Sequence, residues 1–252
     1  MTMRALLVLV LVGAGSARAE HDHGPAPATA SSTFGAGVSL FAARYDQMLY
    51  DGDYQGFAPA LRWSNARFGV SASLPMYRLV ENGRTLYGPG DGVVSGQVTH
   101  QRDAWLGGIA VALSVPTGEH RNGFGMGHAM VMPAMFVAVA IDRVRLGATA
   151  GYGHALGDAG SEHEHGQWPI VEPMNLSELT WGASGDVMIV HSVTAGARVL
   201  GAVPVGDGQS RVVAGARTAW TAGRVETGFE IQAGLHGDPF SIRGVLETTL
   251  RF

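Results

Sequence analysis

The segment from Ser241 to Phe252 constrains the fold more than any other part of the chain, because it is an amphipathic strand at the end of the sequence. Its even-numbered positions carry Ile, Leu and Phe, whereas its odd-numbered positions include Arg243, Glu247 and Arg251. An open amphipathic edge invites pairing with another chain. A closed membrane barrel has no such edge, so one strand can end both the barrel and the chain. The segment therefore predicts the closing strand of a barrel.

The start of the chain predicts export. Arg4 precedes an apolar run from Ala5 to Val12, and small residues then lead to Ala17-Arg18-Ala19. This order is typical of a secretory signal peptide cleaved before Glu20. The apolar run is shorter than the roughly 20 residues of a membrane-spanning helix. We therefore expect residues 1–19 to be a signal peptide.

Composition divides the rest of the chain in two. Residues 20–32 are rich in His, Pro and Ala, which predicts a flexible periplasmic leader before a barrel domain of residues 33–252. The chain has no cysteine, which excludes a disulfide framework. Its formal net charge of −4 gives no reason to expect nucleic-acid binding.

Alternation of apolar and polar residues continues along the whole barrel domain and predicts about twelve strands. The expected ranges are 33–45, 54–63, 67–80, 93–100, 105–117, 128–140, 144–155, 176–190, 193–205, 210–221, 225–236 and 241–252.

The connections between these segments alternate in length. Tight turns follow every second strand, for example at 64–66 and 141–143, while the others span 46–53, 81–92, 118–127, 157–175, 206–209 and 237–239. Short periplasmic turns and longer extracellular loops around an even strand number are typical of an outer-membrane barrel. A soluble β-sandwich, the alternative, has no reason to gather its longer loops at one end. The expected fold is all-β, a closed antiparallel transmembrane barrel in the bacterial outer membrane.

Charged residues on the polar faces of the strands should point into the barrel, because a charge facing lipid costs roughly 2–4 kcal/mol at the midplane. They either brace the barrel through ion pairs or line a solute path, and the sequence leaves both possibilities open. These expected lumen-lining residues are Arg62, Arg145, Glu178, Asp186, Arg198, Arg217, Glu226, Glu230, Arg243 and Glu247.

Two short segments carry resemblances to known proteins. Leu113-Ser114-Val115-Pro116-Thr117-Gly118, followed by Gly123-Phe124-Gly125-Met126-Gly127, resembles the Pro-Thr-Gly and glycine-rich segment of the family named for the MetA pathway of phenol degradation. That resemblance implies an outer-membrane barrel that passes small, often hydrophobic molecules. The ending at Phe252 resembles the terminal-aromatic assembly signal of bacterial outer-membrane barrels, which implies the barrel assembly machinery as a partner.

Histidine and methionine suggest a second possibility, because imidazole suits zinc and copper and thioethers suit soft copper(I). Two His-x-His pairs stand at His21 and His23 and at His163 and His165. Near the loop after the fifth strand, Met126, Met130, Met132 and Met135 surround His128. Solvated tails and ordinary packing are the plainer explanations. The candidate metal residues are His21, His23, His163, His165, Met126 and His128.

Catalysis has little support in the sequence. No G-x-S-x-G motif occurs, and Ser177, Ser184 and Ser192 have only His154 or His191 as conceivable bases. The sequence therefore predicts a channel or transporter for small molecules, not an enzyme, with no cofactor and with outer-membrane lipid as its surroundings. The alternatives are a barrel that handles copper or zinc and a closed structural barrel.

Overall fold

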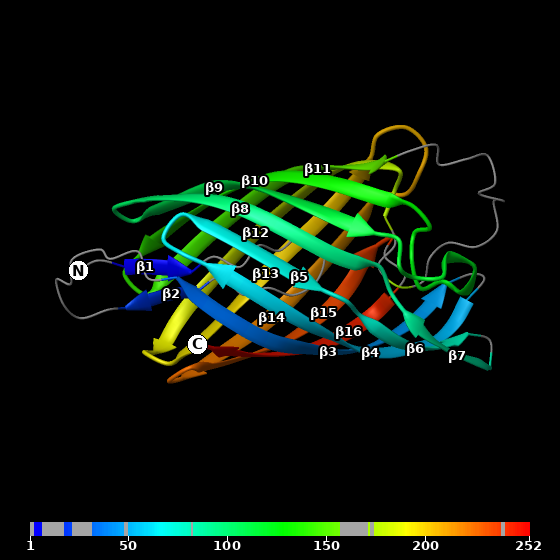
Figure 1. The fold of residues 1–252 in the computed structure, drawn as a ribbon, viewed down its shortest axis with the longest axis horizontal. Coiled ribbons are helices and arrows are strands. Elements are labelled where there is room, and N and C mark those ends of the chain that lie inside the picture. Colours follow the sequence, from blue (N-terminus) through cyan, green and yellow to red (C-terminus); the bar gives the residue numbers. More distant parts are fainter. Residues whose placement is uncertain are drawn as a thin grey trace.

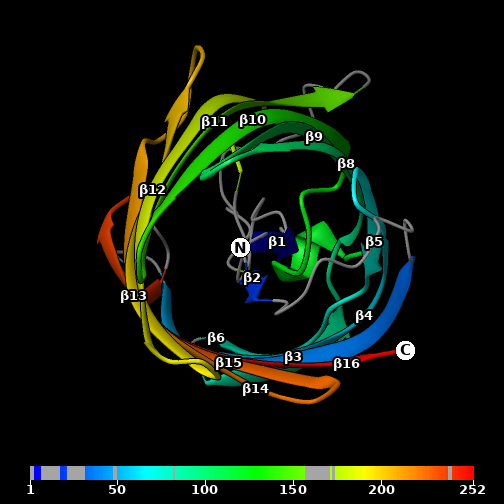
Figure 2. The same cartoon turned by 90° about the vertical axis from the view of Figure 1, so that its left-hand side faces the viewer.

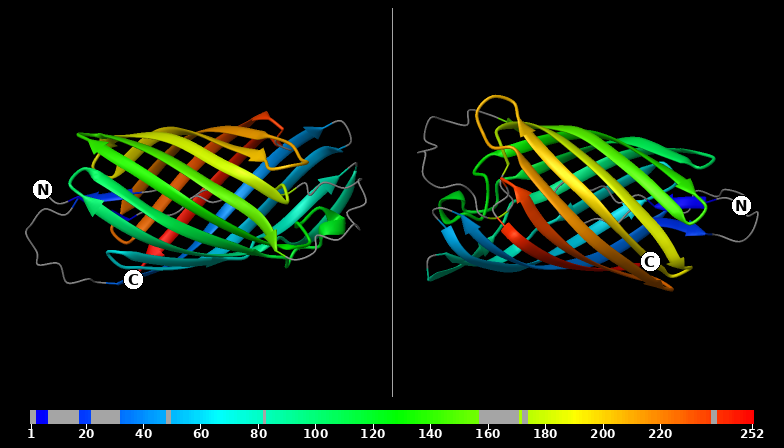
Figure 3. Two further views of the ribbon diagram at one scale, coloured as in Figure 1. Left: turned by 90° about the horizontal axis from the view of Figure 1, so that it is seen from above. Right: turned by 180° about the vertical axis from the view of Figure 1, so that it is seen from behind.

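The computed structural model describes residues 3–6, 18–21, 32–47, 50–81, 83–156, 171, 174–237 and 240–252. Twelve antiparallel strands close into the barrel that the sequence predicts. Figure 1 shows this barrel from the side, Figure 2 shows it end-on as a ring, and Figure 3 shows that its strands are tilted. Tilt is a geometric requirement of closing a sheet on itself.

The wall follows chain order. Its strands are β3 (Thr33–Gln47), β4 (Tyr50–Ser64), β5 (Phe68–Ser73), β8 (Gly92–Arg102), β9 (Trp105–Val115), β10 (Ala129–Ile141), β11 (Val144–Leu156), β12 (Ser177–Val190), β13 (Val193–Pro204), β14 (Arg211–Ala222), β15 (Val225–His236) and β16 (Phe240–Arg251).

The seam between β16 and β3 closes the barrel. The two strands pair from Gly35 opposite Arg251 to Tyr45 opposite Phe240. The backbone N–H of Phe252 continues this ladder and donates to the carbonyl of Phe34 at 2.8 Å. The expected strand 241–252 is therefore the closing strand of the ring.

The third expected strand, 67–80, is interrupted. β5 ends at Ser73, and β6 (Met76–Glu81) begins after Pro75; β4 pairs with β5 through one part and with β6 through another. Proline has no N–H to donate to a ladder, which accounts for the break. β6 then forms a hairpin with β7 (Arg84–Pro89), so the loop expected at 81–92 contains a strand.

The two ends of the barrel differ as expected. Short turns lie at one end, the turn end, at residues 65–67, 103–104, 142–143, 191–192 and 223–224. At the other end, the loop end, are the connections 116–128 and 205–210, while most of the loop expected at 157–175 lies outside the described residues. The loop expected at 46–53 is wrong, because β3 and β4 pair as far as Gln47 opposite Tyr50.

The outer faces of the strands are largely apolar, and on β12 to β16 the inner faces carry charged and polar side chains. On β12, Leu179 and Trp181 face outward and are 53 % and 42 % exposed, whereas Glu178 faces inward and is 1 % exposed. The same alternation exposes Phe229 and Ile231 on β15. Apolar side chains on the outside are what a bilayer requires, because lipid chains cannot solvate polar groups.

Two short strands stand apart from the wall. β1 (Met3–Leu6) and β2 (Arg18–His21) form an antiparallel pair, which Figure 2 shows inside the ring. β1 lies within the expected signal peptide, whose removal stays a prediction. None of the helices in the described part of the chain is long and apolar enough to span a membrane.

Candidate functional site

Ion pairs cover the inner face of the wall from β12 to β15. The Arg198 guanidinium donates to Glu230 at 2.7 Å, and both side chains are almost completely buried. Arg217 pairs with Asp186 through two hydrogen bonds of 2.5 and 2.8 Å. Two-point contacts between guanidinium and carboxylate fix the geometry of both groups. These pairs therefore link strands that lie two apart in the wall, β13 with β15 and β12 with β14, in a defined relation across the interior.

The network extends to β16 and β3. Arg243 donates to Gln232 at 2.6 Å, and the Ser39 hydroxyl donates to Glu247 at 3.1 Å across the barrel seam. Arg251 pairs with Glu226 near the turn end.

The ten expected lumen residues all lie on the inner faces of their strands, in buried or half-buried positions. Sequence reasoning left out Arg211 and Arg251, which also make ion pairs there. Strict alternation from Arg217 and from Glu247 places both on the same faces, so the signal was available.

The opposite side of the interior is uncharged. The inward residues of β8 include Ser95, Gln97 and Thr99, and those of β9 include Ala110 and Ala112. Within the described ranges, no inward residue of β5, β8, β9 or β10 carries a charge. The barrel interior thus has one wall of ion pairs and one uncharged wall, which carries polar side chains on β5 and β8 and mainly small or apolar ones on β9 and β10.

Residues 116–128, which connect β9 to β10, fold into the barrel (Figure 2). This inward loop contains a short 3-10 helix, η1 (His120–Asn122). Asp91, in the β7–β8 connection, accepts backbone hydrogen bonds from Gly118 at 3.0 Å and from Met126 at 2.7 Å. One carboxylate therefore pins both ends of the loop.

The Pro-Thr-Gly segment supplies a second attachment. The Thr117 hydroxyl donates to the carbonyl of Gly90 at 2.7 Å and accepts the N–H of Gly92 at 2.8 Å. Together with Asp91, these contacts bind the start of the inward loop to the β7–β8 connection at three points. The distinctive sequence motif is thus a docking element for the loop.

Close packing explains two of the loop glycines. A Cβ on Gly118 would come within 2.6 Å of the Phe124 carbonyl oxygen, and a Cβ on Gly125 would collide with the Asp91 carboxylate. Burial raises the pKa of the Asp91 carboxyl, although the two backbone donors and His128 and His120 act to lower it. The anchor is therefore a carboxylate held against a cost of desolvation.

Aromatic packing holds the tip of the loop against the wall. Phe124 is 2 % exposed and stacks on Tyr77 of β6, with ring centroids 6.5 Å apart and planes 15° apart. Tyr45 and Tyr54 belong to the same buried cluster, from β3 and β4. The loop tip thereby fills part of the interior at the loop end.

The segment before β12 closes over the same loop. Val171 donates its N–H to the carbonyl of Gly123 at 3.2 Å, and Met174 donates its N–H to the Met126 sulfur at 3.4 Å. Two separate connections thus meet inside the barrel.

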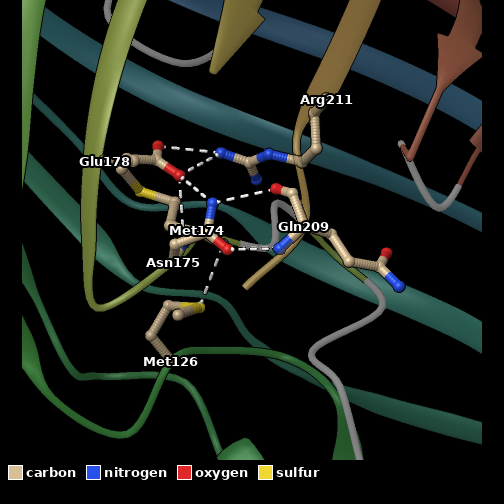
Figure 4. A network of polar contacts seen from close by, with 6 residues as sticks. All are labelled: Met126, Met174, Asn175, Glu178, Gln209 and Arg211. Atoms are coloured by element: carbon tan, nitrogen blue, oxygen red, sulfur yellow. Dashed lines mark hydrogen bonds and ion pairs between the residues drawn. The ribbon is translucent and has the colours of Figure 1, made fainter. Parts of the chain in front are cut away.

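Glu178 anchors this second connection, as Figure 4 shows. Its carboxylate accepts the backbone N–H of Asn175 at 3.0 Å and two hydrogen bonds from Arg211 at 2.7 and 2.8 Å. Asn175 also exchanges two hydrogen bonds with the backbone of Gln209. Glu178 therefore ties the segment before β12 to the start of β14.

The expected metal residues are only partly within the described chain. His23, His163 and His165 lie outside the described residues, and only the backbone of His21 is described. Among the described residues, no three His, Cys, Asp or Glu side chains are grouped to hold a metal ion.

Three of the four methionines expected around His128 share one buried cluster. Met126, Met130 and Met132 pack together with Met174, which the sequence did not indicate, while Met135 faces outward and is 63 % exposed.

One serine and histidine do meet. The Nδ1 atom of His154 lies 2.8 Å from the Ser177 hydroxyl, and the two residues are directly opposed in the β11–β12 ladder. The Tyr152 hydroxyl approaches the same nitrogen at 3.5 Å. A catalytic histidine needs an orienting partner on its other ring nitrogen, whereas both hydrogen bonds described for His154 are at Nδ1, and its ring stacks on that of Tyr152. The pair is a cross-strand contact.

Known proteins are similar to this chain in fold alone. No protein-family model and no curated protein sequence matches the chain. The COG4313 outer membrane channel from Pseudomonas putida F1 is similar in structure, with a TM-score of 0.67, 13% sequence identity, and coverage of 92% of this chain and 100% of that one.

Two further solved structures are similar. The KdgM porin has a TM-score of 0.55 and 8% identity over 86% of this chain and 99% of its own. The translocator domain of the autotransporter NalP from Neisseria meningitidis has a TM-score of 0.54 and 12% identity over 90% of each chain. The fold of this protein is therefore the fold of outer-membrane β-barrels, and it is porin-like.

Proposed function

We propose that the protein is an outer-membrane channel for small solutes, whose path runs through the barrel interior and is narrowed by the inward loop of residues 116–128. The supporting observation is the attachment of that loop by Asp91, with Thr117 beside it. Ion pairs between strands are sufficient to brace a wall. A connection folded inward and held at several points instead restricts passage through an interior.

The cellular location, the orientation in the membrane and the family expected from the sequence are part of this proposal. Residues 1–19 direct export, the turn end faces the periplasm and the loop end faces outward. The Pro-Thr-Gly segment and the fold shared with the COG4313 channel support a place in the family named for the MetA pathway of phenol degradation. Small hydrophobic molecules are then the expected solutes, and the inner faces of β9 and β10 offer them a mainly apolar surface.

Conductance in planar bilayers tests the proposal. We expect discrete channel openings from the purified protein, and Arg217→Ala should shift the ion selectivity toward cations because it removes a positive charge from the interior. Arg143→Ala, in an exposed turn, is the matched control and should leave the selectivity unchanged.

A closed structural barrel remains the competing function, because the inner ion pairs also suit a filled interior. Absence of conductance and of solute flux, both in the natural protein and in a variant with the loop released, would favour the structural barrel.

A further inference from the structure

Four methionines from three separate segments meet where the inward loop contacts the wall. Met126 belongs to the inward loop, Met130 and Met132 to the inner face of β10, and Met174 to the segment before β12. Their exposed fractions range from 0% to 9%, and they form one buried cluster with Ala112. Four of the chain's ten methionines thus converge at one junction.

Two sets of contacts describe how Met126, Met130 and Met174 meet. The Met126 sulfur accepts the backbone N–H of Met174 at 3.4 Å (Figure 4). The terminal methyl groups of Met130 and Met174 both lie beside Gly153 of β11, at 3.5 and 3.6 Å from where its Cβ would stand. Methionine has three rotatable side-chain bonds, so the thioethers of one packed cluster can turn toward a shared ligand.

The chemistry of the cluster selects one kind of ligand. Thioethers are neutral, soft donors that suit Cu(I) and poorly suit hard divalent cations. The chain has no cysteine, so thioethers and imidazoles are its soft donors. The described residues hold no group of His, Asp and Glu side chains fit for a divalent metal.

We propose that Met126, Met130, Met132 and Met174 form a binding site for a soft monovalent metal cation of the Cu(I) and Ag(I) class. This site goes beyond the proposed channel function and does not depend on solute conduction. Because its ligands come from the inward loop, the wall and the segment before β12, a bound cation would link all three and hold the loop inward.

Packing alone is the competing explanation, and substitution by leucine separates the two. Leucine keeps the apolar volume of methionine at a cost usually under about 1.5 kcal/mol, but it has no sulfur to bind a metal. Met135→Leu is the matched control, because Met135 is on the same strand and faces outward.

The experiment titrates Ag(I), which needs no reductant, into the purified full-length protein in detergent. We expect one more equivalent of tightly bound Ag(I) in the natural protein and in Met135→Leu than in the variant with all four methionines changed to leucine. Histidines that bind Ag(I) elsewhere add the same number of equivalents in all three proteins, so they cancel in the comparison. Single Met130→Leu and Met174→Leu variants should each weaken this site by at least about tenfold. Zn(II) should not compete for it.

X-ray absorption of the bound silver gives a reading that does not depend on any variant folding. Sulfur neighbours around the metal in the natural protein support the proposal, whereas a shell of nitrogen or oxygen alone overturns it. Equal Ag(I) stoichiometry in the natural protein and in a folded four-leucine variant also overturns it. Conductance of the four-leucine variant is measured alongside, so that loss of the metal site is distinguished from loss of the channel.

Discussion

Asp91→Ala should release the inward loop. The substitution removes two hydrogen bonds from backbone N–H groups to a carboxylate, at 2.7 and 3.0 Å. Hydrogen bonds to charged groups contribute about 1.5–3 kcal/mol each, which gives roughly 3–6 kcal/mol for the two. Burial raises the pKa of this carboxyl, so desolvation offsets part of that sum. We take roughly 2–4 kcal/mol as the net loss, a change of about 30- to 1000-fold in the ratio of docked to released loop.

Thiol labelling can measure this ratio, because the chain contains no cysteine of its own. A Met126→Cys background keeps the backbone N–H that binds Asp91 and places one thiol at a position that is 9% exposed. We expect maleimide to label this thiol at least about 30-fold faster when Asp91→Ala is added. Asp91→Asn keeps one acceptor oxygen and should show a smaller increase.

Asp207→Ala, in an exposed connection at the same end, is the control for loss of an acidic side chain and should leave the labelling rate unchanged. Labelling of Asp91→Ala and Asp207→Ala within twofold of each other in folded protein would show that Asp91 does not anchor the loop. In bilayers, the same release should lengthen the open periods of the channel.

Three further changes test the loop anchor, a buried ion pair and the final residue. Gly125→Ala should mimic loss of the anchor because its Cβ displaces the Asp91 carboxylate, while Gly244→Ala, with open space around it, should be neutral in the same labelling assay. Arg198→Leu leaves the buried Glu230 carboxylate without its guanidinium partner and should lower the free energy of unfolding in urea by about 3–5 kcal/mol. The double variant, with leucine at both 198 and 230, should lose less. Equal losses in the two variants would argue against a stabilising pair. Deleting Phe252 should reduce assembly in cells more than it lowers the melting temperature of refolded protein, and parallel reductions would remove its role as a signal.

The wall was predictable because each strand repeats its facing over many residues. β15 runs over the expected range of 225–236, and β12 begins one residue after its expected start. The break between β5 and β6 had a local signal in Pro75, which cannot donate to a ladder. The hairpin of β6 and β7 had a weaker sequence signal, because short segments with little alternation resemble loops.

The interior site was less predictable because its contacts join residues far apart in the sequence. Asp91 and Met126 are 35 positions apart, and Met126 and Met174 are 48 apart. Periodicity assigns each side chain to a face but does not say which connection folds inward. The glycines at 118 and 125 belong to the segment that carries the family resemblance, and only the structure shows that they pack against the Phe124 backbone and Asp91.

The seam between β3 and β16 has a consequence for folding. Ser39 and Glu247, which meet across it, are 208 positions apart. Joining two points at that separation costs about 5 kcal/mol in chain entropy before any seam contact forms. Contacts between neighbouring strands close much shorter segments, so the hairpins should form first and the seam last. Until then the nascent sheet has two bare edges, at β3 and at β16, that can capture strands of other molecules. A chaperone is therefore most needed before the seam closes, while β3 and β16 are still unpaired.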